Sequence, residues 1–131
     1  LAVRVVGGAW PEGLPDDEDL GLPASRHWRL LQRVHAPGDG QLSAILARLS
    51  DAGRDGIRHP HPEVLGVLDP RPLLDDAAAL AARYGGGLLI AETLAAGLLH
   101  GRRLFFGTQA NVGRPLASAA PELGIAVHVI T

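Results

Sequence analysis

The segment GLLIAETLAAGLLHGRRLFFGTQANVGRPLASAAPELGIAVHVI, residues 87–130, decides the expected fold. Its apolar runs predict strands at 87–91, 104–106 and 125–130, and the stretch 93–100 predicts a short helix. Continuous apolar strands that alternate with helices are typical of a mainly parallel sheet with helices packed on its faces. The sequence therefore predicts an α/β fold with a mainly parallel sheet and flanking helices.

The region before this segment is predicted to contribute two more helices. Apolar residues spaced by three and four predict a helix that begins near Gln41 and ends at Gly53; they are Leu42, Ile45, Leu46 and Leu49. A second helix is predicted over 73–84, with Gly85 ending it.

Residues 1–39 differ in character from the rest of the chain. The stretch 2–6 predicts a short strand, 7–23 is rich in glycine and proline and predicts a loop, and 26–34 has a weak helical pattern. We therefore divide the chain into a strand and loop-rich segment, residues 1–39, and an α/β segment, residues 40–131.

The composition restricts the classes of function. The chain has no cysteine and a net charge of −2. It therefore has no disulfide or thiol nucleophile, and the total charge gives no argument for binding nucleic acid or an anionic membrane. We see no membrane-spanning apolar run and no signal peptide, so we expect a cytoplasmic protein.

All twelve cationic side chains are arginine, and the chain contains no lysine. Arginine keeps its proton in proteins and cannot act as an amine nucleophile. No lysine amine of this chain is therefore available to form an imine with a carbonyl group.

Two short motifs resemble ligand-binding motifs, but we expect neither to bind a ligand. His59 and His61 point to the same side of an extended segment and would suit a shared metal ion, but no third ligand follows at a diagnostic spacing. We expect no metal site there. The glycines 85–87 follow a predicted helix and precede a predicted strand, which is the reverse of a phosphate-binding loop, so we expect a tight turn.

Two other positions lie where ligands bind in open α/β sheets, at the carboxyl ends of strands. Glu92 follows the predicted strand 87–91, and its carboxylate is suited to pair with a cationic ring nitrogen or an arginine. The alternative is a residue in the first turn of a helix, favoured by the helix dipole. The loop 107–115 carries amide groups on Gln109 and Asn111 and either lines a site or simply connects two elements.

Several elements then occur in an order that resembles a known family. They include PEVLGVLD (62–69), the helix, glycine turn and apolar run over 78–90, ETLAAGLL (92–99) and GTQANVGRPLASAAPELG (107–124). Residues 40–124, about two-thirds of the chain, are similar to part of the glycine dehydrogenase (decarboxylating) P-protein, in its N-terminal-half or subunit 1 type. In that family the third element reads Asp-Pro-(Leu/Ile)-Ser-Leu-Gly-Leu-Leu.

This resemblance implies part of the large domain of a pyridoxal-phosphate (PLP) enzyme of fold type I. It implies glycine decarboxylation with PLP, aminomethyl transfer to a lipoylated H-protein, and a catalytic P-protein subunit as partner. By the resemblance, Glu92 corresponds to the aspartate that pairs with the PLP ring nitrogen, and Gln109 and Asn111 contribute to the cofactor site. The Schiff-base lysine falls near Ala110, where the subunit 1 type also has none. The resemblance therefore implies a module that is inactive alone.

Two alternatives from other classes remain open. One is a small α/β binding or interaction module without catalysis. The other is a small nucleotide- or phosphate-binding protein of Rossmann-like build, suggested by the loops at strand ends.

Overall fold

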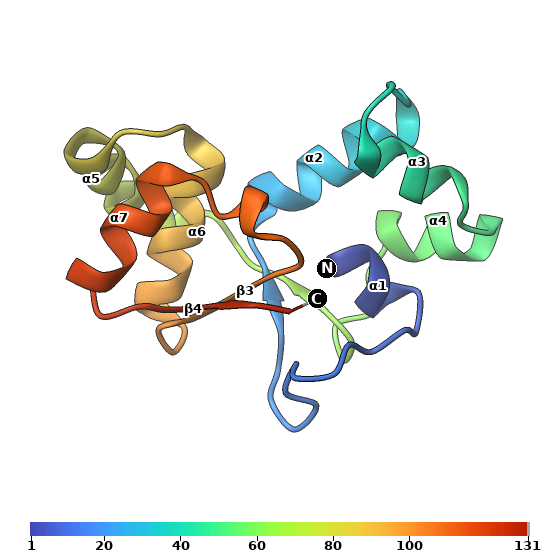
Figure 1. Cartoon of the computed structure of the whole chain (residues 1–131), viewed down its shortest axis with the longest axis horizontal. Helices are drawn as coiled ribbons and strands as arrows, with labels where there is room; N and C mark the ends of the chain where they lie inside the picture. The colour runs from blue at the N-terminus through green and yellow to red at the C-terminus, as the bar shows by residue number, and fades with distance from the viewer. Residues whose placement is uncertain (131) are drawn as a thin grey trace.

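The computed structural model describes residues 1–130, and Figure 1 shows the order of its elements. Its α-helices are α1 (Ala2–Val6), α2 (Ala24–His35), α3 (Gln41–Ala47), α4 (Asp51–Arg58), α5 (Leu74–Tyr84), α6 (Leu88–Leu99) and α7 (Arg114–Glu122). Two short 3₁₀ helices are η1 (Arg71–Leu73) and η2 (Gln109–Asn111). The strands are β1 (Gly21–Leu22), β2 (Gly66–Val67), β3 (Arg103–Phe106) and β4 (Ala126–Val129).

The strands form two separate parallel pairs. β1 pairs with β2, and Gly21 lies opposite Gly66. β3 pairs with β4, from Arg103 opposite Ala126 to Phe106 opposite Val129, and α7 makes the connection between them. The mixed α/β character with parallel strands is thus confirmed. Within residues 1–130, however, the strands do not join into one larger parallel sheet.

The largest correction concerns residues 87–91, which are not a strand but the beginning of helix α6. The segment from Leu88 to Leu99 is twelve residues long and consists mostly of leucine and alanine, which favour a helix. It is apolar on all sides, so its periodicity cannot distinguish a buried strand from a buried helix. All residues from Ala91 to Gly97 are buried, which explains why the segment has no polar face.

Two further predictions about local structure were wrong. Residues 2–6 form helix α1 rather than a strand, because Val3 and Val5 are buried in two different clusters and α1 packs on α4. Gly53 does not end a helix but lies inside α4. Ser50 caps that helix by accepting a hydrogen bond from the Gly53 amide at 3.1 Å, so α3 ends earlier, at Ala47.

Other predictions are confirmed. The helix predicted over 73–84 is η1 followed by α5, and it ends at Gly85, whose φ of +77° requires glycine. The weak helical pattern at 26–34 belongs to α2, and the strands predicted at 104–106 and 125–130 are β3 and β4.

The buried side chains form one large cluster and two small ones. The large cluster, here called the C-terminal core, joins α5, α6, α7, β3 and the start of β4; its buried residues run from Leu73 to Ile125. One small cluster contains Val5, Leu14, Leu22 and Leu65, and the other contains Val3, Leu46 and Ile57. Figure 1 shows the corresponding arrangement, with α5, α6 and α7 on one side and α1, α3 and α4 on the other.

The small clusters cross the boundary drawn at residue 39. Val3 packs with Leu46 and Ile57, and β1 pairs with β2. Among residues 1–130, no helix is both long and apolar enough to cross a membrane.

Candidate functional site

A buried polar cluster joins α2 to α6, and it contains one of the residues that the sequence singled out. The Glu92 side chain is only 2% exposed, and its Oε1 accepts a hydrogen bond from the Ser25 amide at 2.9 Å. Ser25 lies in the first turn of α2, which begins directly after β1 and Pro23 and has no capping side chain of its own at the N-cap position. Glu92 therefore supplies from another helix the negative charge and the acceptor that a helix N-terminus favours.

Arg26 forms the second part of the cluster. Its Nε donates to Thr93 Oγ1 at 2.6 Å, and that hydroxyl donates to the Leu89 carbonyl oxygen at 2.6 Å. The guanidinium carbon lies 5.3 Å from the centre of the Phe106 ring, at the carboxyl end of β3. Arg26 thus lies near the carboxyl end of β3, whereas the strand predicted before Glu92 is instead the start of helix α6.

Arg26 and Glu92 influence each other electrostatically, although no direct ion pair joins them. Burial lowers the pKa of the Arg26 guanidinium, and the negative charge of Glu92 raises that pKa. Arginine stays protonated in either case, so the positive charge of Arg26 offsets the negative charge that Glu92 carries into the interior. The Ser25 hydroxyl is buried without a hydrogen-bond partner within residues 1–130, so the cluster is not fully paired.

The other two predicted site residues lie on η2, after β3. Gln109 and Asn111 are both exposed, and so is Ala110 between them. No hydrogen bond in the described part of the chain joins Glu92 to either amide side chain. The structure therefore places Gln109 and Asn111 at the surface and Glu92 in the interior.

These residues do not fit a PLP site. A carboxylate that pairs with the PLP ring nitrogen must be accessible to the cofactor. Glu92 is buried, and its Oε1 already accepts a hydrogen bond from the Ser25 amide. The chain also offers no lysine amine anywhere along its length.

The histidine motif lies at the surface, and the glycine motif connects two helices. His59 and His61 are exposed, and His61 Nδ1 accepts from the Glu63 amide at 3.3 Å. No group of three or more histidine, cysteine, aspartate or glutamate side chains able to hold a metal occurs between residues 1 and 130. The glycines 85–87 form the turn between α5 and α6, with φ of +77° at Gly85 and +83° at Gly86.

Two open grooves lie outside this cluster. The larger, about 490 Å³, is lined by Trp10, by the carboxylates Asp16 to Asp19 and Glu63, and by Val5, Val6, Gly8 and Val64. The smaller, about 250 Å³, lies between α7 and β4 and is lined by Gln109, Ala117, Ala120, Pro121, Ile125, Val127 and Val129. The carboxylates of the larger groove are exposed, so they are free to be hydrated and do not by themselves define a ligand.

Sequence reasoning missed Ser25, Arg26 and Thr93. The hydrogen bonds that join them to the cluster connect residues 67 apart in the chain, and no local pattern signals such a pairing. A comparison with protein-family models, curated proteins and solved structures finds no match for this chain. The resemblance to the P-protein therefore depends on the sequence elements alone.

Proposed function

We propose that this chain is a non-catalytic α/β module of P-protein type, which acts by binding a partner subunit. The observation that carries this proposal is the environment of Glu92. Its carboxylate is 2% exposed and holds the N-terminus of α2 through the Ser25 amide, so it contributes to the fold instead of to a cofactor. The lack of any lysine supports the same conclusion, since imine chemistry needs an amine.

The β3–η2–α7–β4 unit supports the P-protein part of the proposal. It contains the segment 107–124, which resembles the last of the family elements, and it has the strand, loop, helix and parallel strand expected of a large-domain fragment. Under this proposal the unit corresponds to part of a fold type I large domain. The partner is then a catalytic P-protein subunit that carries the lysine and PLP.

The exposed face of η2 is the part of this unit that we assign to partner binding. Gln109 and Asn111 present amide donors and acceptors at the surface, where they are available to another chain. The nucleotide alternative gains no support, because the helix N-terminus that follows β1 already has the Glu92 carboxylate against it. A phosphate there would face a like charge.

The proposal is tested by binding and by absorbance. We expect the purified chain to show no PLP imine band alone and to bind a purified lysine-bearing P-protein subunit in a titration followed by calorimetry. The double variant Gln109→Ala and Asn111→Ala should weaken binding about tenfold, as expected for losing a few hydrogen bonds at an interface. Ser118→Ala, an exposed change on α7, serves as the control.

A second variant separates the structural role of Glu92 from a cofactor role. Glu92→Gln should leave the PLP absorbance maximum of the complex unchanged, because the carboxylate does not reach the ring nitrogen. A shifted maximum would mean that Glu92 contacts the cofactor. Failure to bind any P-protein subunit at high micromolar concentration would reject the proposed partner.

A further inference from the structure

The outer edge of β4 has backbone groups that no strand satisfies in the described part of the chain. The Ala126 amide donates to the Arg102 carbonyl at 2.9 Å, and the Ile130 amide donates to the Phe106 carbonyl at 2.7 Å. Backbone groups of successive residues in a strand point to opposite sides. The amides and carbonyls of Val127 and Val129 therefore point away from β3, toward the open edge.

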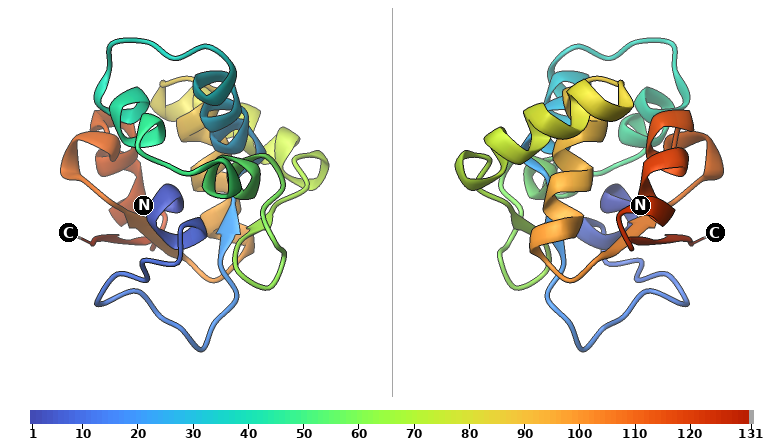
Figure 2. Two further views of the ribbon diagram at one scale, coloured as in Figure 1. Left: turned by 90° about the vertical axis from the view of Figure 1, so that its right-hand side faces the viewer. Right: turned by 90° about the vertical axis from the view of Figure 1, so that its left-hand side faces the viewer.

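This edge lacks the features that usually prevent strand pairing. Residues 125–130 read IAVHVI, with no proline, no glycine and no carboxylate, lysine or arginine. Both views of Figure 2 show β4, in dark red, at the periphery of the molecule. An uncharged, β-branched edge strand in that position is suited to accept another strand.

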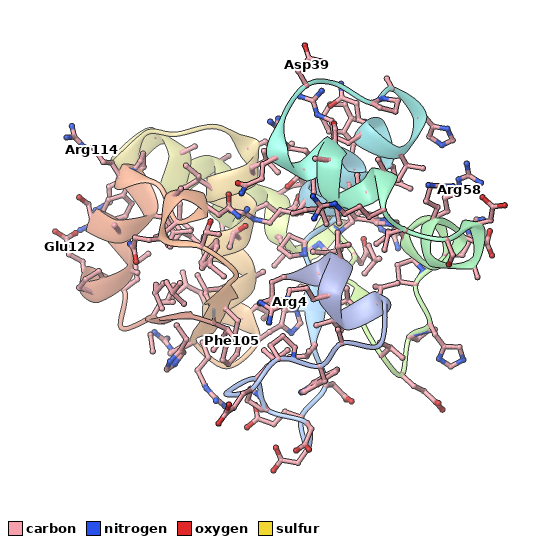
Figure 3. All side chains as sticks on the ribbon, turned by 45° about the vertical axis from the view of Figure 1, so that its right-hand side comes forward. Arg4, Asp39, Arg58, Phe105, Arg114 and Glu122 are labelled. Carbon is pink, nitrogen blue, oxygen red and sulfur yellow. The ribbon has the colours of Figure 1, made fainter. Side chains whose placement is uncertain are left out.

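The smaller groove lies beside this edge, and none of its lining side chains is charged; Gln109 is its one polar side chain. Ala117, Ala120 and Pro121 of α7 form one wall, and Val127 and Val129 form the other. The charged residues at the two ends of α7, Arg114 and Glu122, are exposed and project outward in Figure 3, and neither lines the groove. An incoming strand therefore meets an uncharged surface, with room for apolar side chains at alternate positions.

We propose that β4 pairs antiparallel with β4 of a second copy of this chain, about a twofold axis that passes beside His128. The open groups of Val127 and Val129 flank His128 symmetrically. In this register Val127 exchanges two hydrogen bonds with Val129 of the second copy, and Val129 does the same with Val127. The result is a four-stranded sheet in the order β3-β4-β4-β3.

A second copy is the occupant that the side chains favour. The chain as a whole carries a net charge of −2 and an acidic run at 16–19, but two β4 edges meet without any carboxylate or ammonium group on either strand. The twofold axis keeps both α7 helices on the same face of the sheet, so Val127 and Val129 of each copy lie beside the groove of the other. A four-residue edge is short. We therefore expect the pairing to bury less than about 1,200 Å², the lower limit for standard interfaces, and the dimer to be weak.

This inference depends on the backbone pattern of β4 and not on the proposed P-protein partner, although Gln109 of η2 also lines the smaller groove. In the proposed register the two His128 side chains face each other across a non-hydrogen-bonded pair, where Cα atoms are about 4.5 Å apart. His128 is exposed, and its ring stacks on Phe105 at 5.2 Å. Its replacement therefore changes the centre of the interface with little change to the core.

Sedimentation velocity over a range of concentrations tests the pairing. The unmodified chain should dimerise, and His128→Lys and His128→Glu should each raise the dissociation constant at least about tenfold through like-charge repulsion. Mixing the two variants should restore dimers, because the opposite charges then face each other. Ser118→Lys is the control for added charge, since Ser118 is exposed and does not line the groove.

Val127→Pro provides an independent variant. It removes the outward amide without removing a β3–β4 hydrogen bond, so it should abolish dimers while circular dichroism stays unchanged. A chain that remains monomeric at high micromolar concentration would overturn the inference. So would a dimer that both charged variants leave intact, or charged variants that fail to pair when mixed.

Discussion

The two sides of the molecule differ in how their apolar residues are distributed. The C-terminal core is one continuous cluster in which α6 contacts α5, α7 and β3. The other side has two small clusters, around Leu22 and Leu65 and around Leu46 and Ile57. The difference shows that a long helix apolar on all sides can organise a core, whereas the shorter helices α1, α3 and α4 form small clusters.

The two sides are also connected by different kinds of contact. Within the C-terminal core the contacts are mainly apolar, while α2 is attached to α6 through the hydrogen bonds of Ser25 and Arg26 to Glu92 and Thr93. Polar attachments contribute less net free energy than apolar burial, but they cost much when one partner is removed. The stability of the side with the two small clusters therefore depends on Glu92 and Thr93, which α6 supplies from the C-terminal core.

The largest loss of stability is expected from truncating a buried side chain at the centre of a cluster on each side. Leu94 and Ile57 are both 1% exposed, so the two alanine variants remove side chains of similar size and burial. Leu94→Ala should lower the free energy of unfolding by about 4 kcal/mol, and Ile57→Ala by about 2 kcal/mol, because the smaller cluster collapses more easily around a cavity. Urea denaturation gives both values, and an equal or larger loss for Ile57→Ala would contradict the comparison.

A smaller effect is expected at the polar attachment. Glu92→Ala leaves the Ser25 amide without its acceptor and should cost about 1–3 kcal/mol. Glu92→Gln keeps an acceptor oxygen and should cost less. Amide hydrogen exchange should speed up at Ser25 and in the first turn of α2 for the alanine variant, while α5 stays protected. Unchanged exchange at Ser25 would show that Glu92 does not hold this helix.

The smallest effect is expected at the surface pair between Arg103 and Glu18. Their side chains are 41% and 53% exposed and lie 2.8 Å apart. Glu18→Gln should change the free energy of unfolding by less than about 1 kcal/mol, and the change should shrink as salt increases. A loss that persists at molar salt would indicate that the loop before β1 is held more tightly than the exposed charges suggest.

Part of the fold and little of the candidate site could be predicted from the sequence. The helix that ends at Gly85 and the strands β3 and β4 were predictable, because a left-handed glycine and short apolar runs are local signals. Glu92 was singled out on the expectation that it follows a strand, but it lies within α6. Its partner Ser25 was out of reach, since a hydrogen bond across 67 residues leaves no local trace.

The sequence by itself determined that no lysine amine is available and that apolar segments alternate with glycine and proline turns. These properties follow from residue identity and from local backbone preferences. Only the tertiary structure decided that 88–99 is a helix and that Glu92 faces inward against α2. A continuous apolar segment is compatible with a buried strand or a buried helix, and what it packs against selects between them.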